Sequence, residues 1–331
     1  MQWVGIILGL LSALGASLAY LCSRQYAVRA QRDEPDAAPW RPPLRLLVTA
    51  HVWLGGACTA ALPVMLLVTR PTLDRPAFAV MMSAGVALFY LVGNVFLFLS
   101  LQRTDASRVA PLLGMKVILL ALTVELFMGE DFTAAQWVAV VMATGAAVML
   151  GTTGGKLPLK TLAMIFLTCA GFVLSDLFIK QMIPSWLPTG VSLDRADKTQ
   201  RITAAVTGMA VAYVWCGGVA LAMLPVVLQG HREGFARGLK ASLPGGLPYA
   251  AAWFLSMVCL FSCFSLVGIV FGGILQSTRG LMSIALGFAL AHLGHHHLEQ
   301  HAPWPVVIRR LIAAAVMTAA IAIYTYEAAK G

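Results

Sequence analysis

Charged residues are scarce in this sequence. They make up 11% of the 331 residues, whereas 59% are hydrophobic, and the mean hydropathy is +0.82. A soluble domain typically carries roughly a quarter of charged residues, so this composition excludes an ordinary soluble protein. The sequence predicts a polytopic membrane protein instead.

Motifs of soluble-type active sites are absent as well. No glycine-rich phosphate loop follows a strand pattern, and no GxSxG nucleophile motif occurs. The six cysteines lie in or beside apolar runs without CxxC spacing, which is typical of small core residues. We therefore expect neither an enzyme nor an ATP-driven pump, and we expect no cofactor and no bound metal.

The formal net charge of +9 would suggest nucleic-acid binding in a soluble chain. Here most lysines and arginines fall in short loops between apolar runs, where they act as topology signals and contact lipid headgroups. We expect no nucleic acid. The expected partners are a small-molecule substrate and the lipid bilayer, for a monomer or homodimer in the cell inner membrane.

Ten apolar runs are long enough to cross a bilayer as helices. The first lacks a basic leader and a clear cleavage site, so we expect a retained helix rather than a signal peptide. The runs lie at about 2–21, 44–68, 77–101, 106–127, 134–151, 160–183, 202–229, 246–266, 268–291 and 304–325.

The two halves of the chain resemble each other. LSALGAS from Leu11 corresponds to LTCAGFV from Leu167, and AAVM occurs at both 146–149 and 314–317. A unit of five spans reverses its orientation when it is duplicated. The sequence thus predicts an all-α membrane protein of two inverted five-helix repeats, 1–152 and 153–331.

The fourth span ends in LFMGEDFT and the fifth begins AAQWVAVVMATGAAVML. This pattern resembles the EamA-type transporters of the drug/metabolite transporter superfamily. The resemblance implies secondary transport of small metabolites with both termini in the cytoplasm, whereas the distribution of basic loop residues favours both termini outside. It also implies proline or an apolar residue at position 116, where this chain has Lys116.

Lys116 and Arg279 are single basic residues within the fourth and ninth spans, each shortly after a corresponding APLL or GGIL segment. A cation at that depth is costly without a partner, so each is a candidate functional residue. Together they would bind a carboxylate, a phosphate or another anion; alternatively, each bonds helix-end carbonyls or a nearby carboxylate. Gln276, Arg279 and Ser283 stand at i, i+3 and i+7 and form one polar stripe, in which Gln276 and Ser283 would orient the substrate.

Asp176 is the candidate for proton coupling. It lies four residues before Lys180, so the two side chains share a helical face, and a simple ion pair near the helix end is the alternative. Asn94, Tyr90 and Trp253 are further candidates for substrate contacts, although interhelical hydrogen bonds and packing are the commoner roles of such residues.

A histidine run near the C-terminus is the most conspicuous local feature. Some of these imidazoles would share a helical face and could bind a transition metal, but a polar loop is the alternative. The run comprises His292, His295, His296, His297 and His301.

We expect a secondary active transporter that moves a small anionic or zwitterionic metabolite by alternating access, with Asp176 as the candidate for coupling to protons. One alternative is a flippase of a lipid-linked phosphate or other amphiphile, for which the same cations would serve. Another, from a different class, is a metal-binding or structural membrane protein built on the histidine run.

Overall fold

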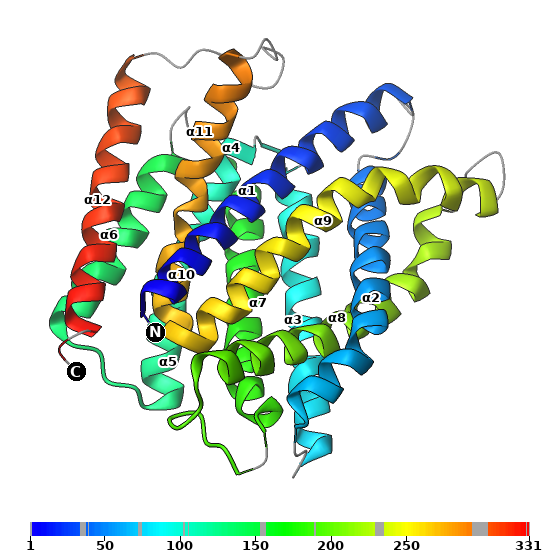
Figure 1. The fold of residues 1–331 in the computed structure, drawn as a ribbon. Helices are drawn as coiled ribbons and strands as arrows, with labels where there is room; N and C mark the ends of the chain where they lie inside the picture. Colours follow the sequence, from blue (N-terminus) through cyan, green and yellow to red (C-terminus); the bar gives the residue numbers. More distant parts are fainter. Residues whose placement is uncertain are drawn as a thin grey trace.

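The fold is described from a computed structural model and is almost entirely helical (Figure 1). In the described part of the chain there is no strand, and the one β-bridge joins Pro71 to Pro188. The described residues are 2–33, 38, 40–71, 75–101, 103–104, 106–152, 157–188, 190–228, 235–292, 304–328 and 330.

Among the described residues, ten helical segments are long and apolar enough to span a membrane, as the sequence predicts, and the all-α membrane fold is confirmed. The helices are α1 (Gln2–Asp33), α2 (Arg41–Thr69), α3 (Pro76–Leu101), α4 (Ala106–Leu112), the 3₁₀ turn η1 (Leu113–Met115), α5 (Lys116–Met128), α6 (Ala134–Gly151), α7 (Leu159–Met182), the 3₁₀ turn η2 (Ile183–Trp186), α8 (Lys198–Leu228), α9 (Phe235–Val267), α10 (Ile269–Ser277), α11 (Arg279–His292) and α12 (Trp304–Ala328).

The fourth and ninth spans are each broken near the middle, which the hydropathy pattern did not predict. In the fourth span, α4 contains Pro111 and passes through η1 into α5. In the ninth, α10 ends at Ser277 and α11 begins two residues later. Lys116 and Arg279 are the first residues of α5 and α11, so both cations stand where a half-helix starts.

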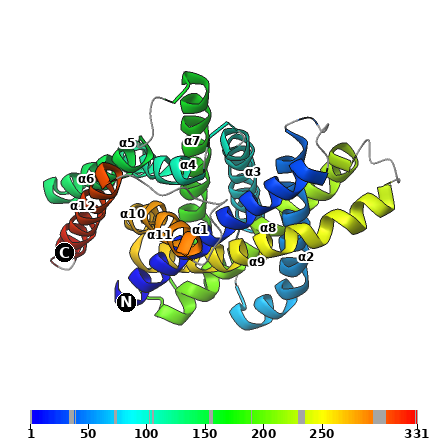
Figure 2. The same ribbon diagram turned by 90° about the horizontal axis from the view of Figure 1, so that it is seen from above.

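Helices of the first half pack mainly against helices of the second. The closest pairs are α2 with α8, α1 with α9, α3 with α7 and α6 with α12. Viewed from above, α6 and α12 lie at one edge and α2 and α8 at the other, with the remaining pairs between them (Figure 2). Exchanging the two halves leaves this pairing unchanged, as a two-fold relation requires; the inverted repeat and its boundary at residue 152 stay predictions.

Both termini lie at the same end of the bundle, as an even number of spans requires (Figure 1). The loop between α9 and α10 at that end consists of a single residue, Gly268, whose φ is 81°. Only glycine adopts this region readily, which explains how two spans follow each other with almost no polar connection.

Glycines set the distance between the paired helices. At the crossing of α2 and α8, a Cβ on Gly55 would lie 2.5 Å from the Cα of Gly217. At the crossing of α3 and α7, a Cβ on Gly171 would lie 2.9 Å from the Cα of Gly93. Membrane helices associate through such close packing because lipid provides no hydrophobic driving force between them.

Replacing Gly55 with alanine tests this packing. We expect Gly55→Ala to lower the free energy of unfolding by about 1–3 kcal/mol, because the new methyl group forces α2 and α8 apart. Gly56→Ala is the matched control, since nothing lies within 4 Å of the added atom, and it should raise stability or leave it unchanged. Equal melting temperatures of the two variants in detergent would contradict the proposed packing.

Candidate substrate site

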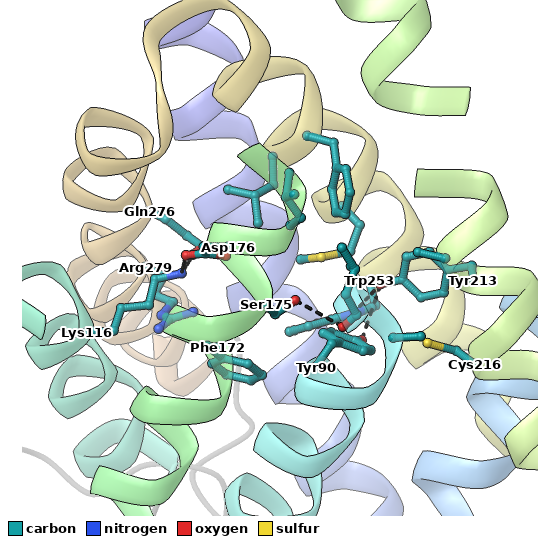
Figure 3. A pocket seen from close by; sticks show the side chains of 17 residues that line it. Tyr90, Lys116, Phe172, Ser175, Asp176, Tyr213, Cys216, Trp253, Gln276 and Arg279 are labelled. Atoms are coloured by element: carbon teal, nitrogen blue, oxygen red, sulfur yellow. Dashed lines mark hydrogen bonds and ion pairs between the residues drawn. The ribbon is translucent and has the colours of Figure 1, made fainter. Parts of the chain in front are cut away.

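A pocket lies between the two halves at the centre of the bundle (Figure 3). Helices from both halves contribute to it, so neither half forms it alone. It is lined by Val86, Ala87 and Tyr90 of α3, Lys116 of α5, Phe172, Ser175, Asp176 and Ile179 of α7, Ala212, Tyr213 and Cys216 of α8, Trp253, Met257, Leu260 and Phe261 of α9, Gln276 of α10 and Arg279 of α11.

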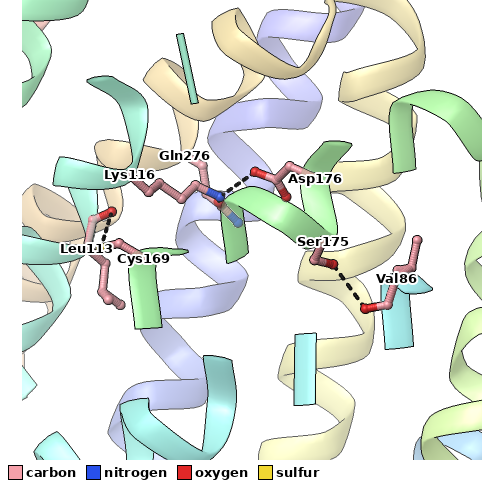
Figure 4. Close-up of polar contacts among 7 residues, drawn as sticks. All are labelled: Val86, Leu113, Lys116, Cys169, Ser175, Asp176 and Gln276. Carbon is pink, nitrogen blue, oxygen red and sulfur yellow. Dashed lines mark hydrogen bonds and ion pairs between the residues drawn. The ribbon is translucent and has the colours of Figure 1, made fainter. Parts of the chain in front are cut away.

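One end of the pocket holds a buried ion pair. The Lys116 ammonium donates to Asp176 Oδ2 at 3.1 Å and to Gln276 Oε1 at 2.7 Å (Figure 4). The side chains of Lys116 and Asp176 are only 4% and 5% exposed. Burying both charges is tolerated because each neutralises the other and the amide oxygen of Gln276 receives a further hydrogen bond.

Arg279 differs from Lys116 because it lacks such a partner. The residue is 2% exposed, and its guanidinium forms no ion pair or hydrogen bond with any residue that the structure describes. Its backbone is held by Ser17, whose hydroxyl donates to the Arg279 carbonyl oxygen at 2.9 Å. The positive charge of Arg279 acts on both Asp176 and Lys116 across the pocket.

The other end of the pocket is aromatic. Trp253 donates to the Tyr213 hydroxyl at 3.1 Å, and Tyr213 donates to the Tyr90 hydroxyl at 3.3 Å. His51 of α2 lies 3.1 Å from the same Tyr90 hydroxyl through Nε2, and its Nδ1 lies 2.7 Å from the Leu47 carbonyl oxygen. These hydrogen bonds join four helices and give the wall a defined shape.

The free volume of the pocket is about 30 Å³. Such a space holds a few water molecules at most, whereas ligand pockets commonly measure roughly 300–1,000 Å³. A metabolite therefore fits only after the surrounding helices have moved.

The structure brings together six of the predicted site residues: Tyr90, Lys116, Asp176, Trp253, Gln276 and Arg279. Two others lie outside the pocket. Asn94 donates to the Tyr90 carbonyl oxygen at 2.9 Å within α3. Ser283 shares the helical face of Arg279 but does not line the pocket, and its buried hydroxyl lacks a hydrogen-bond partner.

The expected Asp176–Lys180 ion pair does not form. Asp176 pairs with Lys116, whereas Lys180 pairs with Glu130, which follows α5. A spacing of four residues permits contact within one helix, but here closer partners on neighbouring helices satisfy both charges.

Tyr213, Phe172, Ser175 and Cys216 were not predicted as site residues although they line the pocket. Tyr213 is the central member of the hydroxyl chain. A tyrosine within an apolar run was the available signal, but Tyr20 and Tyr249 share that signal and do not line the pocket.

Most of the predicted histidine run, His295 to His301, lies outside the described residues. Among the residues that the structure does describe, no group of three or more possible metal ligands is present. The metal-binding alternative stays a prediction.

Comparisons with known proteins agree with this architecture. Residues 3–152 match the EamA-like transporter family. One solved structure, described only as "Crystal structure of protein", is 15% identical, covers 97% of this chain and 98% of its own, and superposes with a TM-score of 0.56. At this low sequence identity, the structural similarity is evidence for the fold only. No curated protein matches the sequence.

The buried charges predict an asymmetric double-mutant cycle. Asp176→Leu should destabilise the protein by about 3–5 kcal/mol, because it leaves two buried cations without a carboxylate. Lys116→Met should destabilise the protein less than Asp176→Leu does, since the positive charge of Arg279 still offsets the charge of Asp176. The double variant, Asp176→Leu with Lys116→Met, should recover most of the stability that Asp176→Leu loses.

Thermal unfolding in detergent measures this cycle, with Lys180→Met as the control. Lys180 and its partner Glu130 are 30% and 49% exposed, so loss of that pair should cost only about 1 kcal/mol or less. Additive effects of the Asp176 and Lys116 substitutions would contradict the assigned ion pair.

Proposed function

We propose that this chain, whose residues 3–152 match the EamA-like transporter family of the drug/metabolite transporter superfamily, carries a small organic anion across the membrane. The central observation in support is Arg279, a buried arginine that faces the pocket without a carboxylate partner. A cation at this depth is expensive to maintain, so its presence favours a role in binding.

The charge balance of the pocket favours a substrate with one negative charge. Lys116 and Asp176 neutralise each other, which leaves the guanidinium of Arg279 as the uncompensated charge. A carboxylate suits it because guanidinium and carboxylate can form two parallel hydrogen bonds. The aromatic end would then receive the less polar part of the substrate.

The position and size of the pocket support transport by alternating access. The pocket lies between the halves of the chain and is too small for a metabolite in this conformation. In the proposed cycle the helix pairs rock about this site, so that it opens to one side of the membrane at a time.

Asp176 is the proposed proton carrier. An anionic substrate that approaches Lys116 competes with Asp176 for the ammonium group and for the field of Arg279. Once displaced, the carboxylate would be buried without its partner, which favours the protonated form. Substrate binding and proton uptake would thereby be coupled.

Ligand-dependent stability tests the binding role of Arg279. A panel of small monocarboxylates and inorganic phosphate is titrated against purified protein in a melting experiment. A ligand at a hundred times its Kd should stabilise the wild type by about 2.7 kcal/mol. Arg279→Gln should remove most of this gain, and Arg279→Lys should restore part of it, because lysine keeps the positive charge but cannot form the two parallel hydrogen bonds of a guanidinium.

Lys160→Gln is the control for this titration, since Lys160 is an exposed lysine at the start of α7, away from the pocket. It should respond like wild type. The proposal fails if no anion stabilises the wild type, or if Arg279→Gln responds as strongly as the control.

Transport in proteoliposomes tests the role of Asp176. Asp176→Asn should lose uptake driven by a pH gradient, because an amide cannot take up and release the proton, but should retain exchange of labelled for unlabelled substrate. Glu125→Gln is the matched control: Glu125 lies outside the pocket and accepts a hydrogen bond from Trp137 at 3.3 Å. Persistent gradient-driven uptake in Asp176→Asn would exclude Asp176 as the carrier.

A further inference from the structure

A second and wider cavity lies at the end of the bundle where both termini are found. Its free volume is about 300 Å³, within the range of small-molecule sites. The walls come from the loop after α5, the C-terminal end of α7, the start of α8, the α9–α10 junction and α12. Both halves of the chain thus contribute, as they do at the central pocket.

Three charged side chains line this cavity, and two of them are basic. Lys180 is paired with Glu130, a half-exposed carboxylate. Arg201 donates through Nε to the Ala196 carbonyl oxygen at 3.2 Å, but among the described residues it has no carboxylate partner. The charge that remains uncompensated in the cavity is therefore positive, as in the central pocket.

The α9–α10 junction adds to this positive potential. Gly268 and the first residues of α10, Ile269 and Val270, line the cavity, and the helix start has no side-chain cap. The first N–H groups of a helix lack intrahelical acceptors and favour negative charge. The backbone dipole of α10 and the Arg201 side chain thus act in the same direction.

The two cavities lie in line along the helices. Ile179 of α7 lines the central pocket, and Ile183, the first residue of η2 directly after α7, lines the wide cavity; on α9, Phe261 and Phe264 have the same relation. Residues three or four apart are one helical turn apart on a single face. The apolar side chains of these neighbouring turns form the layer between the two cavities.

We propose that the wide cavity is a second binding site for small monoanions, with Arg201 as its main cationic ligand and Lys180, held by Glu130, as an auxiliary one. This assignment rests on the proposed function, because the cavity would be the vestibule from which the transported anion reaches the central site. The apolar layer between the cavities then acts as the barrier that opens during transport.

Charge-selective thiol labelling tests the vestibule independently of the substrate's identity. Ser265 lines the cavity, and Ser265→Cys introduces a thiol of similar size. The probes are sulfonatoethyl methanethiosulfonate, an anion, and trimethylammonioethyl methanethiosulfonate, a cation. The wild type, with its six native cysteines, provides the background labelling rate. Ser192→Cys, at an exposed loop position, provides the reference rate against which the rate of each reagent at Ser265→Cys is compared.

We expect the anionic reagent to be favoured on the order of tenfold at Ser265→Cys, because clefts of one charge concentrate oppositely charged reactants. Arg201→Gln should remove most of this preference, and Arg201→Lys should retain it. Lys198→Gln is the matched control, since Lys198 is an exposed cation on the same helix outside the cavity, and it should change little.

Equal labelling by both reagents, no labelling at all, or an unchanged preference in Arg201→Gln would each overturn the proposed site. The result is independent of the central site, because Arg279→Gln should leave the preference unaltered. A charge-selective cavity, together with anion-dependent stabilisation that Arg279→Gln leaves unchanged, would thus support the second site while the proposed function fails. Anion-dependent stability without selective labelling would show the reverse.

Discussion

The burial of three charges among apolar helices constrains the rest of this structure. Lys116, Asp176 and Arg279 lie where water is excluded, and an unpaired charge there costs several kcal/mol. One ion pair forms among them, between Lys116 and Asp176. It joins α5 of the first half to α7 of the second, with Gln276 of α10 as a further acceptor. The same interaction thereby joins the two halves and, among the described residues, leaves Arg279 without a carboxylate partner.

Two backbone features allow this arrangement. Breaks in the fourth and ninth spans place Lys116 and Arg279 at the starts of half-helices, where irregular backbone is tolerated because it is buried in protein. Glycines at the helix crossings, such as Gly55 against Gly217, let the paired helices approach closely enough for these side chains to meet. The site therefore depends on packing at some distance from it.

The two cavities differ in size, and the wide one lies at the end of the bundle where the termini are found. The central pocket is too small for a metabolite, whereas the wide cavity at the end of the termini can admit one. The Lys180–Glu130 pair lies at that wider end and is partly exposed. An exposed ion pair contributes little to stability, so the Lys180–Glu130 pair holds this end of the molecule less firmly than the buried Lys116–Asp176 pair holds the centre.

Sequence alone determined the ten spans and the candidate cations. A transmembrane helix satisfies its own backbone hydrogen bonds, so its length and hydropathy are local properties, and Lys116 and Arg279 stood out as charges within apolar runs. Sequence spacing suggested Lys180 as the neighbour of Asp176, whereas packing selected Lys116, sixty positions away. The helix breaks, the role of Tyr213 and both cavities were likewise decided by tertiary structure, because each depends on which surfaces of different helices face each other.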